Sequence, residues 1–186
     1  LKARQLENTT NASAVRRMSM KELWQETIGV DLDLYLTHEA LFDLCIKKGY
    51  EPEKGERYED LFYRIFLNEI EPCLKNMGFV MVYYYPCQMA SLAKLSSHDP
   101  RYAERVEVYA DGVELANGFT ELTDGSEQRQ RFEEEQDIRK KLGKPVFPID
   151  EEFIAAVDAL PDCAGIAVGV DRLVQVLLGC EKIDDV

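Results

Sequence analysis

The segment that most constrains the fold lies near the carboxyl end, where a strand-like run leads through glycines into an Asp-Arg pair. Residues 163–173 have the sequence Cys-Ala-Gly-Ile-Ala-Val-Gly-Val-Asp-Arg-Leu. Small and β-branched residues favour a strand, and the residues after the last glycine favour a helix. An arginine at the start of such a helix can meet a phosphate or stack on a base. We therefore predict a ligand site around Arg172; the alternative is a structural salt bridge.

Length and charge narrow the possible functions. A chain of 186 residues with 46% hydrophobic content can form one compact domain. The net charge is −13, whereas a domain that binds a nucleic-acid backbone carries a positive charge. We therefore expect no extensive contact with tRNA or DNA. No apolar run reaches the roughly 18 residues that span a bilayer, and the amino-terminal residues lack a signal core. We expect a cytoplasmic protein without a membrane partner.

The cysteines and histidines do not suggest metal or thiol chemistry. Five cysteines are scattered among mostly apolar neighbours, which predicts buried thiols in a reducing compartment: Cys45, Cys73, Cys87, Cys163 and Cys180. His38 and His98 are far from each other and from any cysteine motif. A zinc site and a Cys-His nucleophile are therefore disfavoured.

The first part of the chain has a helical pattern. Residues 1–19 are polar and without a sustained period, which predicts a mobile lead-in. Residues 20–77 form a mainly helical segment, with helices expected over 20–29, 37–50 and from 57 onward. Thr37 is a predicted N-cap, and Pro72 is expected to break the last of these helices.

Residues 78–186 mix strands and helices. A central strand is predicted over 79–86, and Asp111-Gly112 predicts the turn of a hairpin over 105–118. Asp124 with Glu127 matches a capping box for an outer, highly charged helix ending at Leu142. A short helix is expected from Asp150 to about residue 160, before the strand and helix of 163–179. This succession predicts an α+β fold with an antiparallel sheet flanked by helices.

The hairpin brings two carboxylates together. A two-residue turn pairs Tyr109 with Glu114, so positions 107, 109, 114 and 116 are expected on one face. Glu107 and Glu114 would repel each other unless a cation lay between them, and Mg²⁺ binds one or two carboxylates together with phosphate oxygens. The alternative is a pair of exposed carboxylates on a solvated face.

These segments together resemble a known family. Glu107, Glu114, the run Ala-Asn-Gly-Phe-Thr-Glu over 116–121 and the run over 163–173 resemble the acidic strands and motif 3 of class II aminoacyl-tRNA synthetases. The match is to the lysyl-tRNA synthetase group, and most closely to the elongation factor P lysine ligases. The resemblance implies ATP and Mg²⁺ as cofactors, with Glu107 and Glu114 as metal ligands. It places Leu115, Gly169 and Arg172 at the ATP site, with Arg172 in the catalytic role.

The same resemblance implies an amino-acid pocket. Asn117 and Phe119 would position the substrate, and Glu121 would pair with its ε-ammonium, with Gly165 and Ala167 in the pocket wall. These residues alternate out of phase with Glu114 unless the strand bulges near 116–118. Plain core packing of Phe119 and an ordinary surface role of Glu121 are the alternatives.

Ala167 separates two groups within the family, because the tRNA-charging enzymes have glycine there and the ligases have alanine. The added methyl favours a β-amino acid. Residues 85–93 also resemble the ligases, although Cys87 and Met89 depart from their pattern.

The resemblance implies that the chain is a partial catalytic domain. Motif 1, motif 2 with its Arg-x-Glu, and an anticodon-reading domain have no match in it, so we expect the carboxyl-terminal half of a longer, homodimeric enzyme that is inactive in isolation. The parent would activate lysine or β-lysine as an adenylate and transfer it to a lysine of elongation factor P. A lysyl-tRNA synthetase fragment and a non-catalytic synthetase-like binding module remain as alternatives.

Overall fold

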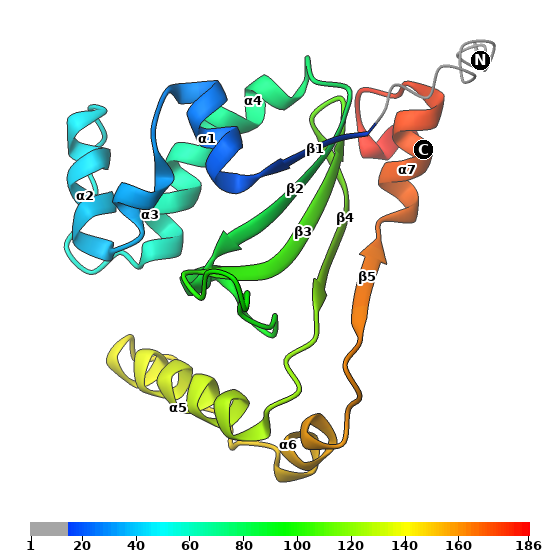
Figure 1. Cartoon of the computed structure of the whole chain (residues 1–186). Coiled ribbons are helices and arrows are strands. Elements are labelled where there is room, and N and C mark those ends of the chain that lie inside the picture. Colours follow the sequence, from blue (N-terminus) through cyan, green and yellow to red (C-terminus); the bar gives the residue numbers. More distant parts are fainter. Residues whose placement is uncertain (1–14) are drawn as a thin grey trace.

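Within the described residues, the fold is built on one five-stranded sheet (Figure 1). The computed structural model describes residues 15–186. The strands follow one another across the sheet in chain order: β1 (Arg16–Ser19), β2 (Phe79–Pro86), β3 (Tyr102–Ala110), β4 (Val113–Thr120) and β5 (Ala164–Val168). Strands β2 to β5 are antiparallel, as predicted, whereas β1 runs parallel to β2. Residues 16–19 are thus a strand where a mobile lead-in was expected, and 1–14 lie outside the described residues.

A helical layer lies in the chain between β1 and β2. It contains α1 (Met20–Ile28), a 3-10 turn η2 (Leu32–Tyr35), α2 (His38–Lys47), α3 (Tyr58–Ile65), a π-helix η3 (Phe66–Ile70) and α4 (Glu71–Leu74). Parallel neighbours cannot be joined by a tight turn, so this layer is the crossover between β1 and β2. In Figure 1 it covers one side of the sheet at β1 to β3.

The main core lies between this layer and the sheet. Fully buried side chains from the helices pack with those of β2, and they include Leu23, Trp24, Leu41, Phe62, Ile65, Ile70, Val80, Val82 and Tyr85. Local signals set the helix ends: Ser19 and Glu22 form a reciprocal capping box, Thr37 accepts the N–H of Ala40, and Gly29 adopts φ 67°. Such caps satisfy N–H and C=O groups that a helix leaves unpaired.

Pro72 does not end the third predicted helix. The π-helix Phe66–Ile70 precedes it, and helical geometry continues over Glu71–Leu74. Proline lacks an N–H and crowds the carbonyl four residues earlier, and the widened turn before Pro72 accommodates both effects.

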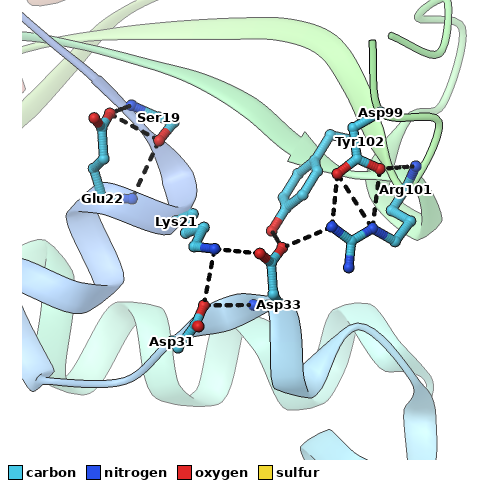
Figure 2. A network of polar contacts seen from close by, with 8 residues as sticks. All are labelled: Ser19, Lys21, Glu22, Asp31, Asp33, Asp99, Arg101 and Tyr102. Atoms are coloured by element: carbon cyan, nitrogen blue, oxygen red, sulfur yellow. Dashed lines mark hydrogen bonds and ion pairs between the residues drawn. The ribbon is translucent and has the colours of Figure 1, made fainter. Parts of the chain in front are cut away.

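A polar network joins the helical layer to the start of β3 (Figure 2). Asp33 on η2 pairs with Lys21 of α1 and accepts a hydrogen bond from the Tyr102 hydroxyl at 2.8 Å. Arg101 contacts Asp33 at 3.2 Å and Asp99 at 2.7 Å. The network connects residues that are 69 positions apart in sequence.

The rest of the chain forms a second helical pair and a final helix. α5 (Gly125–Lys141) is mostly exposed and begins at the N-cap Asp124, as predicted. Glu127 does not complete a capping box, because its carboxylate pairs with Arg131 instead. α6 (Glu151–Asp158) is capped by Asp150, and α7 (Val170–Leu178) follows β5 directly.

The cysteines form no disulfide, but only Cys45 is buried; Cys73, Cys87, Cys163 and Cys180 are partly exposed, contrary to the prediction that all are buried. Along residues 15–186, no helix is both long and apolar enough to cross a membrane.

Candidate nucleotide and amino-acid site

A one-residue bulge in β4 decides which side chains share the candidate site. Tyr109 pairs with Glu114 and Val108 with Ala116, so Leu115 is the extra residue. Beyond the bulge Glu107 lies opposite Asn117. The predicted bulge exists, but it lies at Leu115 and not near 116–118, and Ala116 faces the other side of the sheet.

The bulge places the predicted residues of β3, β4 and β5 on one face. Phe119 lies opposite Arg105, while β5 sets Ala167 opposite Asn117 and Gly165 opposite Phe119. This face is also the one that carries Val80 and Val82, which the helical layer covers at β2. The candidate site is therefore the continuation of the core face over β3 to β5, where Gly165 and Ala167 are exposed.

Glu107 is buried and fully engaged. Its side chain is 7% exposed, and Oε1 accepts a hydrogen bond from Arg105 Nη2 at 2.7 Å. Oε2 accepts the Tyr109 hydroxyl, and Asn117 Nδ2 donates to Oε1 at 3.5 Å. Burial first, and the neighbouring Glu107 carboxylate second, raise the pKa of Tyr109 far above its ordinary value, so this hydroxyl stays a donor.

Glu114 forms a second carboxylate–arginine pair at the end of β5. Arg172 Nη1 donates to Glu114 Oε2 at 3.3 Å and to the Glu114 carbonyl oxygen at 3.0 Å. The side chain of Arg172 is 51% exposed and that of Glu114 is 35% exposed. The salt bridge weighed as an alternative for Arg172 is thus present, and its partner is itself a predicted site residue.

The backbone brings the nucleotide residues together. The Gly169 N–H donates to the carbonyl oxygen of the bulged Leu115 at 2.8 Å, which fixes the start of α7 against β4. A Cβ on Gly169 would lie 3.4 Å from Arg172 Cδ, an ordinary contact, and Gly169 has φ −74°. The fold itself does not require glycine at this position.

The predicted amino-acid residues lie further along β4 and β5. Glu121 donates its N–H to Cys163 O at 3.0 Å, and a Cβ on Gly165 would lie 3.1 Å from Glu121 Oε1. Gly165 therefore leaves the space beside this carboxylate, which has no ion-pair partner within residues 15–186. Phe119 packs on a small cluster of Ala90, Ala93 and Ala103, so its packing role is real as well.

Two residues near the site were not assigned from the sequence. Arg105, 15% exposed, contacts Glu107 and Asn117. Glu71 is half-buried; burial first, and then repulsion by Glu114 and Glu107, raise its pKa. No sequence signal pointed to Glu71, because the expected break at Pro72 put it at the end of a helix. Arg105 was visible only as a neighbour of Glu107, two positions away on the same strand face.

The carboxylates of the candidate site fit a complex of Mg²⁺ with a nucleotide only in part. Between Val15 and Val186, no cluster of three or more acidic, histidine or cysteine side chains is arranged to hold a metal by itself. Mg²⁺ typically binds one or two carboxylates and completes its octahedron with phosphate oxygens and water. Glu114 is partly exposed and paired with the half-exposed Arg172, so it fits that chemistry better than Glu107, whose oxygens already accept three donors.

A cleft of about 1080 Å³ adjoins this face on the side of α5. Its lining comes from α3, the 3-10 turn η4 (Cys87–Met89), the loop after it, β3 and α5, and includes Tyr63, Met89, Arg105, Gln128 and Arg131. Arg105 is the residue that this cleft shares with the carboxylate cluster.

Comparison with known proteins identifies the family of the chain. The family model for class II tRNA synthetases (D, K and N) matches residues 2–186. An elongation factor P-(R)-β-lysine ligase of Proteus mirabilis is 50% identical over 184 residues, 97% of this chain and 56% of that protein. The ligase of the same name from Avibacterium paragallinarum is 41% identical over 170 residues, 91% of this chain and 52% of that protein. The chain thus spans about half the length of the curated relatives it matches, and it belongs to the class II tRNA synthetase (D, K and N) family.

Proposed function

We propose that this chain is part of an ATP-dependent ligase that activates lysine or β-lysine as an adenylate and transfers it to a lysine of elongation factor P. The observation that carries the proposal is the single sheet face that joins Glu107, Glu114, Asn117, Phe119, Gly165 and Ala167, with Arg172 at its end. The relatives named for this reaction support the choice of substrate and acceptor.

Each residue has a defined task in this proposal. Arg172 and the Leu115–Gly169 backbone contact border the place of the nucleotide, where the guanidinium stabilises negative charge on the phosphates. Glu114, with Glu107 behind it, would hold Mg²⁺, which supplies charge neutralisation at the phosphate oxygens. When nucleotide binds, Arg172 exchanges its contact with Glu114 for one with phosphate.

The amino acid would occupy the β4–β5 end of the face. Glu121 offers the carboxylate for a substrate ammonium, because it lies beside the space that Gly165 leaves and has no cationic partner among the described residues. Asn117 and Ala167 face each other across β4 and β5 and would border the reacting end of the substrate.

We also propose that the complete protein works in the cytoplasm as a homodimer and without tRNA. The resemblance to lysyl-tRNA synthetases supports the dimer, and the net charge of −13 argues against a broad contact with the tRNA backbone.

The test uses the natural full-length protein. ATP–pyrophosphate exchange is measured with (R)-β-lysine, α-lysine and ornithine, and transfer is measured as a mass increase on elongation factor P and as charging of lysine tRNA. We expect exchange with β-lysine or lysine and a mass increase on elongation factor P alone. Charging of tRNA without modification of elongation factor P would assign the chain to a tRNA-charging enzyme, and no exchange at all would leave a binding module.

A further inference from the structure

Arg105 contacts four separate groups around the candidate site. Its Nη2 donates to Glu107 Oε1 at 2.7 Å, its Nη1 to the Met89 carbonyl oxygen at 3.1 Å, and its Nε to Asn117 Oδ1 at 3.4 Å. The guanidinium also stacks on the ring of Tyr85, whose centroid is 4.7 Å from Cζ. A planar guanidinium has fixed donor directions, so these contacts also fix its orientation.

The fixed guanidinium determines which way the Asn117 amide points. Asn117 Oδ1 faces the Nε–H of Arg105, and Nδ2 faces Glu107 Oε1 at 3.5 Å. The reverse orientation would put an N–H donor against Arg105 and a carbonyl oxygen against the Glu107 carboxylate. Both neighbours therefore favour the same orientation of the amide. The Glu107 carboxylate can only accept a hydrogen bond, so Arg105 provides the N–H donor for Asn117 Oδ1.

One N–H of the Asn117 amide remains for a ligand. Among residues 15–186 the amide nitrogen donates only to Glu107, and a primary amide carries two N–H donors. Asn117 lies opposite Ala167 on the exposed part of the face. The site therefore presents a donor at this point, which suits an oxygen acceptor of the substrate and not its ammonium groups.

We propose that Arg105 is a positioning residue for the amino-acid substrate, acting through the orientation of the Asn117 amide. Arg105 itself does not touch the substrate in this proposal. The inference rests on the proposed function, because it assigns Asn117 to the amino-acid end of the site.

The decisive variant is Arg105→Lys in the natural full-length protein. Lysine keeps a positive charge for Glu107 but lacks the guanidinium fork, so the Asn117 carbonyl loses its donor. In pyrophosphate exchange we expect the KM for the amino acid to rise about tenfold, equivalent to ~1.4 kcal/mol, with kcat and the KM for ATP within about twofold of wild type. In an Asn117→Ala background the same change should leave the amino-acid KM unaltered.

A persistent tenfold effect in the Asn117→Ala background, or a parallel rise in the KM for ATP, would overturn the proposal in favour of an action through Glu107. Arg101→Lys is the matched control, because Arg101 is on the same approach to β3 but pairs with Asp99 and Asp33 away from the site. This control should leave all kinetic constants at the wild-type level.

Two further measurements keep the test independent of folding and of the proposed function. Asn117→Asp leaves Arg105 in place and retains its acceptor but removes the free N–H, so we expect a similar rise in the amino-acid KM; wild-type affinity would contradict the donor role.

Without substrate, the side-chain ¹⁵N resonance of Asn117 should shift in Arg105→Lys and not in Arg101→Lys. If wild type activates no amino acid, the proposed function fails, whereas an unshifted resonance rejects the positioning role of Arg105 by itself.

Discussion

At the scale of single residues, the two predicted metal carboxylates differ in burial, and their substitutions should differ accordingly. Glu107→Gln removes the charge that compensates buried Arg105, and breaking such a buried pair costs about 3–5 kcal/mol. Glu114→Gln weakens a half-exposed pair with Arg172, and a pair of that kind contributes about 1 kcal/mol or less. We expect both variants of the full-length protein to lose exchange activity, but only Glu107→Gln to lower the thermal midpoint strongly. Normal exchange in Glu114→Gln would remove this residue from the nucleotide site.

Ala167 tests the substrate preference. Its methyl lies on the exposed part of the face opposite Asn117, so removing it leaves no buried cavity. A single methyl in a pocket discriminates between substrates by about 1–3 kcal/mol, or about 10- to 200-fold. We expect Ala167→Gly in the full-length protein to shift the ratio of kcat/KM from β-lysine towards α-lysine, with an unchanged KM for ATP. An unaltered ratio would indicate that Ala167 does not contact the amino acid.

At the scale of elements, the network of Figure 2 makes the contact between the helical layer and β3 dependent on pH. Lys21, in first place, and the Tyr102 hydroxyl lower the pKa of Asp33, while burial opposes them. A lowered folded-state pKa stabilises the fold above the unfolded value of about 4 and loses that effect as the pH falls through the folded value. We therefore expect the free energy of unfolding to decrease from pH 5 downward.

The variant Asp33→Asn should remove part of this pH dependence and cost about 1–3 kcal/mol at pH 7, because hydrogen bonds to a charged group are lost. Chemical denaturation of both proteins at pH 7 and at pH 3 measures the difference. Glu26→Gln is the control, since the Arg16–Glu26 pair is exposed on both sides and should change stability by less than about 1 kcal/mol. An equal effect of both substitutions would show that Asp33 has no special role.

Features that depend on adjacent residues could be predicted from the sequence. Features that depend on contacts between residues far apart in the chain could not. The turn at Asp111-Gly112 and the N-caps Thr37 and Asp124 depend on a few adjacent residues, and each is present. The bulge at Leu115 depends on a hydrogen bond from Gly169, more than fifty residues away, and no local pattern encodes it. The π-helix before Pro72 likewise replaced the predicted break, because packing of Phe66 and Ile70 in the core outweighs the local effect of proline.

The candidate site shows the same division. Family resemblance gave Glu107, Glu114, Asn117 and Arg172 from their motif positions, and the bulge explains how the first three share a sheet face. The salt bridge of Arg172 was one of the two alternatives considered, but Glu114 was not identified as its partner. The Arg105–Glu107 pair was not predicted, because the repulsion between the two carboxylates was expected to require a metal. Arg105 was overlooked because its partner Asn117 is twelve positions away, across the hairpin.

At the scale of the whole molecule, the site is open to solvent on one side. Gly165, Ala167 and Arg172 are all exposed, whereas an adenylate-forming site must exclude water from the reacting groups. We expect residues 1–186, purified alone, to show no measurable pyrophosphate exchange under conditions in which the full-length protein is active. Exchange by the 186-residue chain at a rate near that of the full-length protein would show that these residues suffice.

The position of β1 has a consequence for how this molecule unfolds. The four residues Arg16–Ser19 precede the helical layer in the chain and pair in the sheet with β2, which follows the layer, so both ends of the layer are anchored in neighbouring strands. α1 to α4 cannot detach as an independent unit while β1 stays paired, and the Asp33–Tyr102 contact ties them to β3 as well. Native-state hydrogen exchange should therefore give the amides of α1, α3 and β2 one common opening free energy, so that the helical layer and the sheet behave as a single cooperative unit.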